Sequence, residues 1–470
     1  MSFAAQMLDE SREVWTARKF VAPIIFINIL FIIALNNLSN SVYLTVMITI
    51  LPLLLLAALN SSFILYLIPI LVFVDIHPLG FAISEWATFW LIISVLFTLR
   101  DIKRKDLYLP IFTSVGVYLF ILVISVFKAE NPFLSLLLIN HYILFIGIIV
   151  AGPLIIKFSQ VIWNIGLIFM GLITLNSLHV IVQAVMTNRR VFGFAGVMFV
   201  DYVGLGIVIL VIMIIFEKDQ IKRIILSIMA MIFVIALVLT QTRTSWISTL
   251  LAVSVMLFYI ALTRNQLSIP SGSIQRFILS SIIIIVVAII AAMVFNPDTF
   301  TRITDIKSGS EPLISESGIA KNSLVTRVLI WSTGYNAFIL NPILGIGAYS
   351  FPFSSNLYYT FSDELFNIYV KGLSPHLTFF AVIIETGIVG LIAFSFLLVS
   401  LLRFTVKAMK TSTDKRNQSL AITIGGCTVY IMISMFTTDA WLWGHGIIVF
   451  GLIVSLQFAL TRIRRLASHE

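Results

Sequence analysis

The 470-residue chain is 60% hydrophobic and only 11% charged, with a mean hydropathy of +1.07 and a net charge of +9. A soluble globular protein carries about 25% charged residues, so this composition excludes a soluble fold and leaves most of the surface facing lipid. A transmembrane β-barrel is excluded as well, because its strands alternate polar and apolar residues, whereas the apolar runs here are continuous. The sequence therefore predicts an all-α polytopic membrane protein.

The apolar residues gather in segments of the length that crosses a membrane. About fourteen of them reach, or nearly reach, the length that spans about 30 Å of hydrocarbon: 20–36, 41–58, 62–79, 84–99, 107–127, 133–156, 159–186, 199–216, 223–241, 244–262, 276–295, 376–402, 419–437 and 442–461. Pro52 and Pro69 interrupt the second and third segments, so a re-entrant pair there would reduce the count to twelve. Both counts are even and predict the two termini on the same side.

Basic residues in the short connections predict the orientation. Four clusters fall on one side of a fourteen-span arrangement: 100–105, 218–223, 403–416 and 462–465. Since cytoplasmic loops carry the excess of Lys and Arg, this side is predicted to be the cytoplasm. The expected organisation is a cytoplasmic segment 1–19, eleven transmembrane helices in 20–295, a long outer loop 296–375, three further transmembrane helices in 376–461, and a cytoplasmic tail 462–470.

Several arginines fall on the predicted outer side, against this rule. They are Arg189, Arg190, Arg243, in a tight turn between two apolar runs, and Arg302 and Arg327 in the long loop. An arginine near the depth of a membrane span costs about 2.5–3.5 kcal/mol on insertion scales. Such residues usually have a partner, and an external anion is a natural one.

The long outer loop contains one predicted helix, residues 323–340. Val328, Trp331, Tyr335 and Phe338 recur at helical spacing and form one apolar stripe. Asn341-Pro342 is expected to end the helix. We expect this helix to lie flat on the outer surface of the membrane, with Arg327 near its start.

Two of these arginines stand in short patterns that carry further detail. Arg243 stands in Thr-Arg-Thr-Ser-Trp, after one apolar run and before the next. Arg327 stands in Thr-Arg-Val-Leu-Ile-Trp, followed by Asn-Pro-Ile-Leu-Gly-Ile-Gly at residues 341–347. A pair of arginines is well suited to an external anion, because guanidinium is planar and binds oxyanions in a bidentate manner.

Further patterns complete a set with a fixed order. His376 stands in Ser-Pro-His-Leu-Thr and precedes Ile-Glu-Thr-Gly-Ile-Val-Gly at residues 384–390. Upstream, residues 190–194 read Arg-Val-Phe-Gly-Phe. Over about residues 185–400, this order and spacing resemble the O-antigen ligase and O-antigen polymerase superfamily of bacterial membranes. The chain departs from the family pattern in two places: Leu377 follows the histidine where the family has Asn, and residues 198–201 replace an Asn-Pro-Asn.

The resemblance implies a GT-C-like helical fold and a specific reaction. Family members transfer a glycan from undecaprenyl pyrophosphate to a sugar hydroxyl, with inversion of the anomeric centre. We expect Arg243 and Arg327 to stabilise the leaving pyrophosphate, and His376 to activate the acceptor, because a histidine with a pKa near about 6.5 can take its proton. The residues predicted to bind pyrophosphate or glycan are Arg189, Arg190, Glu385 and Asp439. No metal and no cofactor are expected, because the sequence holds no metal-ligand pattern.

Each of these residues also has a structural interpretation. Arg243 could reach toward outer headgroups, His376 could cap a helix at the interface, and Glu385 could be a buried structural acid. Trp441 is predicted to belong to the aromatic belt at the membrane interface. The remaining histidines are scattered along the sequence and are expected to be structural: His77, His141, His179, His445 and His469.

The functional hypothesis is therefore a glycosyltransferase of the bacterial inner membrane, with both termini in the cytoplasm. It would assemble O-antigen, capsule or exopolysaccharide, and a polymerase is preferred over a ligase. Its expected partners are the lipid-linked glycan, membrane lipids and other membrane proteins of polysaccharide assembly, and nucleic acid is not among them. The alternative is a lipid-linked oligosaccharide flippase, which should show two similar halves; no such halves are seen here.

Overall fold

The structure is a computed structural model that describes residues 61–73, 83–96, 109–187, 191–267, 272, 323–410, 415–439, 441 and 444–467. Within these ranges 84% of the residues are helical and no strand occurs. Six of the described helices are long and apolar enough to cross a membrane. The all-α polytopic architecture predicted from the sequence is thereby confirmed.

The helices of the bundle follow the predicted apolar segments closely. Their bounds are α3 (Ser61–Leu71), α4 (Ile83–Leu96), α5 (Leu109–Val126), α6 (Pro132–Ile155), α7 (Ser159–Thr187), α8 (Phe199–Phe216), α9 (Gln220–Leu239), α10 (Arg243–Leu262), α16 (Thr378–Lys410), α17 (Lys415–Ser434) and α18 (Gly444–Ala467). Short 3₁₀ helices lie at Gly193–Met198, Arg264–Gln266 and Ser355–Leu357. The predicted spans 20–36, 41–58 and 276–295 lie outside the described residues, so the total of twelve to fourteen stays a prediction.

Helix α8 lies at the centre of the described bundle. Its sequence is apolar on every side, and almost all of its residues are buried, as expected for a helix that is hydrophobic all round. It packs against α9, α10 and α17, while α6 packs along α18 and α5 along α16. These helices share one large hydrophobic core.

The predicted cytoplasmic ends of the helices are joined by polar side chains that bind backbone carbonyls. Arg462 at the end of α18 donates to the Pro153 carbonyl near the end of α6. Arg464 donates to Ala408 O at 2.9 Å and to Asn417 O. The Pro153 and Ala408 carbonyls are among the last of their helices, which leave carbonyls without intrahelical partners, and the contacts place four chain segments at the same end of the bundle.

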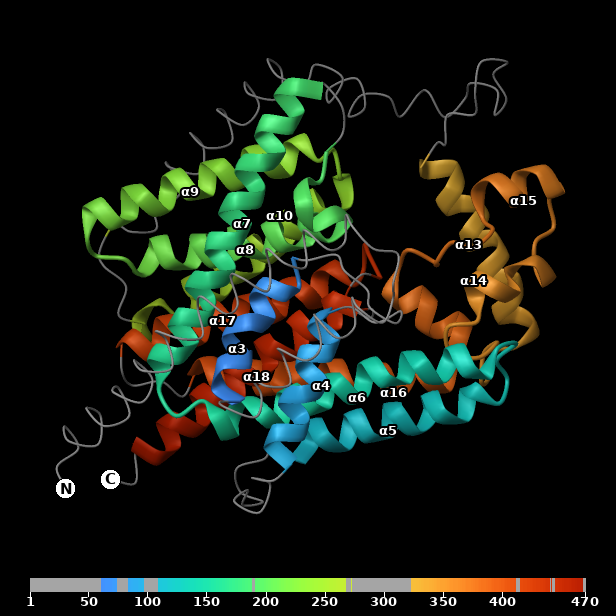
Figure 1. Ribbon diagram of the computed structural model, residues 1–470, viewed down its shortest axis with the longest axis horizontal. Coiled ribbons are helices and arrows are strands. Elements are labelled where there is room, and N and C mark those ends of the chain that lie inside the picture. The colour runs from blue at the N-terminus through green and yellow to red at the C-terminus, as the bar shows by residue number, and fades with distance from the viewer. Residues whose placement is uncertain are drawn as a thin grey trace, which may run out of the picture.

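The predicted outer loop forms a separate layer at the opposite end. It consists of α13 (Ser323–Leu340), α14 (Phe351–Ser354) and α15 (Asp363–Tyr369), drawn in gold and orange at the right of Figure 1. The layer has a small hydrophobic core of its own, to which α16 contributes Ile384. Figure 1 shows it beyond the ends of α5, α6 and α16.

Helix α13 begins and ends where the sequence predicts, but the predicted stripe is not its packing face. Val328 and Tyr335 are 60% and 59% exposed, whereas Ile330, Thr333 and Ala337 are fully buried. Gly334, on the buried face, lies against Phe380 and Ile384 of α16. The small residues allow the two helices to approach closely, and the larger apolar side chains stay free to face the membrane surface.

Trp441 departs from its predicted place. Its side chain is fully buried between Tyr202 and Tyr430, with ring centroids 6.4 Å and 6.3 Å away. The prediction of an interfacial belt residue is therefore wrong. An aromatic residue beside a predicted membrane boundary has the same sequence signal whether it faces headgroups or a neighbouring helix.

Candidate functional site

The outer layer is fixed to the bundle by an exchange of backbone hydrogen bonds. Helix α16 is broken at Gly387 (φ 66°, ψ −168°), so its carbonyls and amides near the break turn outward. Ile346 N donates to Ile384 O and Gly347 N to Glu385 O, both at 3.0 Å. In return, Ile388 N donates to Pro342 O at 2.9 Å. The Asn-Pro-Ile-Leu-Gly-Ile-Gly and Glu-Thr-Gly patterns are therefore two halves of one contact.

Glycine is needed at this contact because two backbones touch. A Cβ at Gly345 would overlap the backbone of Glu385, and a Cβ at Gly387 would overlap the carbonyl of Ile343. Both glycines also have positive φ, 68° and 66°, which L side chains rarely adopt. These two glycines thus hold the outer layer in register with α16.

Glu385 directs its carboxylate at the loop that follows this contact. Oε2 accepts from Tyr349 N at 2.9 Å and Oε1 from Phe351 N at 3.4 Å. Tyr349 has φ +56°, a conformation that is costly for a non-glycine residue. Among the described residues the partners of Glu385 are thus backbone amides rather than an arginine, and its part in substrate binding stays a prediction.

Arg327 and His376 are brought together by the packing of α13 on the segment before α16. Trp331 lies one helical turn beyond Arg327 and donates from Nε1 to Pro375 O at 3.3 Å. The next residue in the chain is His376, and the charge of Arg327 acts on its imidazole. Two residues predicted from separate patterns therefore meet in one place.

The backbone and ring of His376 are both in special states. Its φ is +59°, a strained conformation of the kind found at functional sites. Nδ1 lies 3.4 Å from Ser374 Oγ. Burial lowers the pKa of His376 below 6.5, the nearby Asp439 carboxylate raises it, and Arg327 lowers it.

Asp439 is the third member of this group. Its side chain is only 8% exposed, and its Oδ2 has no hydrogen-bond partner in the part of the chain that the structure describes. Burial lowers the pKa of Arg327, and the Asp439 carboxylate acts in the opposite direction and raises it. A half-buried guanidinium, an imidazole and a buried carboxylate thus share one electrostatic environment.

The chain segment that carries Asp439 is bound from two sides. Thr378, at the start of α16, donates from Oγ1 to Thr438 O at 2.8 Å. Ser248, in the second turn of α10, lies 2.7 Å from Thr437, hydroxyl to hydroxyl. The start of α10, which carries Arg243, is therefore joined to the same segment.

Arg243 is placed less firmly than Arg327. It is the first residue of α10 and is exposed. Its side chain makes no hydrogen bond or ion pair with the described residues. Its side chain is available to a ligand that approaches from the predicted outer side. Arg189 and Arg190 lie outside the described residues.

Sequence reasoning missed a second acid in this region, Asp201 at the start of α8. It is 3% exposed, the Tyr430 hydroxyl faces it, and the charge of Asp439 acts on it. Close by, Tyr202 Oη and Trp441 Nε1 are buried without hydrogen-bond partners among the described residues. The only available signal was a charged residue at the start of an otherwise apolar segment.

Comparison with known families gives a match for this chain. Residues 228–395 match the family model described as O-antigen ligase. The matched segment is of the O-antigen ligase family. It runs from α9 to α16 and includes Arg243, Arg327, His376 and Glu385, whereas Asp439 lies beyond it. A search of curated proteins finds no match.

The O-antigen ligase match confirms the resemblance to the O-antigen ligase and polymerase superfamily. Together with the six apolar helices, the match supports a multi-pass protein of the bacterial inner membrane. It also supports a glycosyltransferase-like enzyme that handles a lipid-linked glycan in O-antigen assembly. This favours a glycan-processing enzyme over the flippase.

Proposed function

We propose that the protein transfers a glycan from undecaprenyl pyrophosphate to a sugar hydroxyl, and that the group formed by Arg327, His376 and Asp439 is its reaction centre. The observation that supports this most strongly is the half-buried Arg327 beside His376 and Asp439, within and next to a segment of the O-antigen ligase family. A guanidinium that is partly removed from water binds an oxyanion more strongly than an exposed one.

His376 is the proposed general base. If Nδ1–H donates to Ser374 Oγ, Nε2 carries the lone pair that takes the proton of the acceptor hydroxyl. The acceptor oxygen then bonds to the anomeric carbon from the side opposite the leaving group, which inverts the centre. The bond from the anomeric carbon to the pyrophosphate oxygen breaks, and its electron pair leaves with undecaprenyl pyrophosphate.

The charges around this step have complementary roles. Arg327 and Arg243 stabilise the negative charge that develops on the leaving pyrophosphate. Asp439 stabilises the imidazolium that forms on His376, in the way a carboxylate supports a catalytic histidine. The lowered pKa keeps His376 neutral, and so able to accept a proton, at neutral pH. No metal and no cofactor are needed for these steps.

The acceptor defines two versions of this function. Transfer to a second lipid-linked repeat makes a polymerase, the version we prefer. Transfer to a completed lipid A core makes a ligase, and the description of the matched family favours this second candidate. Capsule and exopolysaccharide assembly use the same chemistry with other repeats.

Genetic complementation tests the proposal and separates the two versions. The gene is expressed in a polymerase-null and in a ligase-null strain, and lipopolysaccharide is examined on gels. A polymerase restores long ladders where a single repeat was attached, and a ligase restores attachment of any repeat. Arg243→Ala, Arg327→Ala and His376→Ala should each abolish the restored product while the protein still inserts. Normal ladders from all three variants would refute the assignment.

A further inference from the structure

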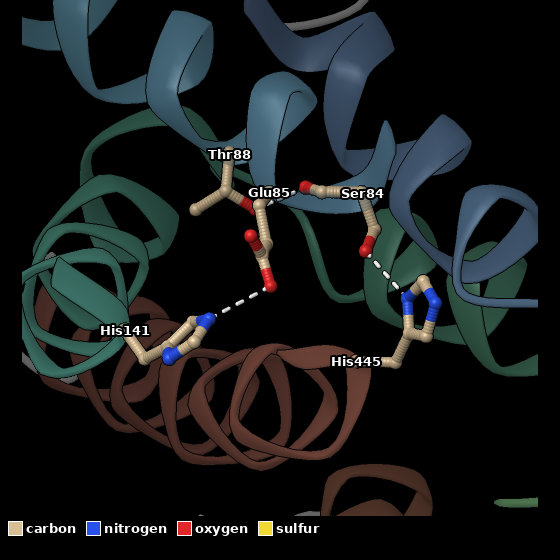
Figure 2. A network of polar contacts seen from close by, with 5 residues as sticks. All are labelled: Ser84, Glu85, Thr88, His141 and His445. Atoms are coloured by element: carbon tan, nitrogen blue, oxygen red, sulfur yellow. Dashed lines mark hydrogen bonds and ion pairs between the residues drawn. The ribbon is translucent and has the colours of Figure 1, made fainter. Parts of the chain in front are cut away.

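A second buried polar cluster lies where α4, α6 and α18 meet, outside the group described above. Glu85 Oε1 is 2.9 Å from His141 Nε2, and Ser84 Oγ is 2.8 Å from His445 Nδ1. Figure 2 shows the two histidines approaching the start of α4 from different helices. Ser84 is fully buried and Glu85 is 4% exposed.

Such a cluster is costly and therefore calls for a reason. A buried carboxylate in an apolar surrounding loses its hydration and is rare in membrane spans unless it is functional. The Thr88 hydroxyl donates a hydrogen bond to Ser84 O at 2.9 Å, which further stabilises this turn of α4. The cluster thus concentrates polar contacts on one fixed point of α4.

That fixed point touches the first two residues of α18. The carboxylate of Glu85 also lies against Gly444, where an added Cβ would be 3.5 Å from Oε1. Gly444 has φ +42°, so the chain enters α18 in a conformation that favours glycine. Ser84 is therefore bonded to the start of α18 through His445, and Glu85, whose hydrogen bond is to His141 of α6, lies close to Gly444.

The start of α18 is only five residues beyond Asp439. The chain before Asp439 is held by Thr378 and Ser248 through Thr438 and Thr437. The chain after it is anchored by Trp441, buried between Tyr202 and Tyr430, and then by Gly444 and His445. A segment fixed on both sides leaves its central carboxylate little freedom.

We infer that Ser84 and Glu85 are positioning residues, which hold the start of α18 and thereby keep the Asp439 carboxylate beside Arg327 and His376. They touch no reacting atom themselves. The inference rests on the proposed function, because the contacts of Ser84 and Glu85 affect the reaction only if Asp439 takes part in it. Loss of either contact would let the segment shift and weaken the interaction of Asp439 with His376.

The charged groups that face His376 in the described residues are Arg327 on α13 and Asp439 before α18. Since Asp439 raises the pKa of His376, its displacement lowers that pKa. This makes the titration of His376 a direct report on the position of Asp439, and it needs no substrate.

The test is a titration of the full-length protein in lipid nanodiscs, labelled with ¹³C-histidine. The chain has six histidines, and His376→Gln assigns the signal of interest. Asp439→Asn should lower the pKa of His376 by about one unit. Glu85→Ala and Ser84→Ala should lower it in the same direction by a smaller amount, and should have no effect when Asp439→Asn is already present.

Two further variants keep the test decisive. Glu85→Gln retains an oxygen that accepts from His141 and should leave the pKa of His376 at its wild-type value. Thr405→Val breaks another buried contact of α18, with Gln457 at 3.1 Å, and should also leave it unchanged.

The possible failures are distinguishable. If Asp439→Asn lowers the pKa of His376 but Glu85→Ala and Ser84→Ala do not, the positioning role is wrong and the proposed reaction centre stands. An equal drop in the pKa of His376 caused by Thr405→Val would also refute the positioning role, because general loosening of α18 would then be enough to explain the shift. If Asp439→Asn has no effect, the reaction centre itself is wrong.

Discussion

Arginines at the two ends of the bundle are used in different ways. At the predicted cytoplasmic end, Arg462 and Arg464 donate to backbone carbonyls of neighbouring helices. At the opposite end, Arg327 is half-buried near Asp439 and His376, and Arg243 is exposed. Arginine side chains thus join neighbouring helices at one end of the bundle and are available to a ligand at the other.

This difference explains why the outer arginines are tolerated against the usual charge distribution. Arg462 and Arg464 obey the positive-inside rule and at the same time join α6, α16, α17 and α18. Arg327 gains no comparable backbone contact among the described residues, although its burial costs free energy. We propose that an anion at the outer surface provides the missing interaction, and that the pyrophosphate of the proposed reaction is this anion.

The largest expected effect is on the transfer rate, which should depend on the arginine at the outer end and not on the one at the cytoplasmic end. Arg327→Gln should lower the transfer rate per folded molecule by about 10²-fold or more, because it removes a charge that acts on the leaving group. Arg464→Gln is the matched control at the other end and should leave that rate within about twofold while costing about 1 kcal/mol of stability. The measurement is product formation by purified protein, normalised to the folded fraction. Equal losses of activity in both variants would remove the distinction.

The second prediction concerns the contact that holds the outer layer. Gly387→Ala places a side chain where φ is positive and where the carbonyl of Ile343 already lies, so it should destabilise the layer by about 1–3 kcal/mol. Gly116→Ala in α5 meets no atom within 4 Å and should be neutral or stabilising by up to about 1 kcal/mol. Limited proteolysis of residues 323–375 compares the two. Equal protection in both variants would contradict the proposed role of the break in α16.

The smallest expected effect is a shift with pH. The proposed base acts when neutral, so activity falls as pH drops through the pKa of His376. Arg327 lowers that pKa and Asp439 raises it. In Arg327→Gln the acid limb of the residual activity should therefore move to higher pH, and in Asp439→Asn to lower pH, each by about one unit or less. Shifts in the same direction in both variants would show that these charges do not both act on His376.

The sequence could predict the helices and most of the local patterns. Continuous apolar runs predicted α5 to α10 and α17 within a few residues, and helical spacing predicted α13. The starts of α16 and α18 were predicted equally well, but both helices continue beyond their predicted ends, to Lys410 and Ala467. It also predicted, through their order in a family pattern, that Arg327 and His376 act together, and the charge of Arg327 does act on His376 in the structure. These successes depend on signals that are local in the chain.

What the sequence could not provide are contacts between distant helices. Nothing near Glu85 indicates that His141 lies opposite it, and nothing near Asp201 indicates the Tyr430 hydroxyl. Both pairs depend on how apolar helices rotate against one another, and helices that are hydrophobic on every side carry little periodicity to fix that rotation. Trp441 was misplaced for the same reason.

The central claim, that this reaction centre faces the outside, is tested most directly by labelling from the outer side. A Cys427→Ala background removes the buried native cysteine. Single cysteines are then introduced at Lys371, exposed just before His376, and at Arg403, exposed near the other end of α16. With a membrane-impermeant maleimide on spheroplasts, position 371 should react in intact cells and position 403 only after lysis. Labelling of position 403 alone in intact cells would contradict the account.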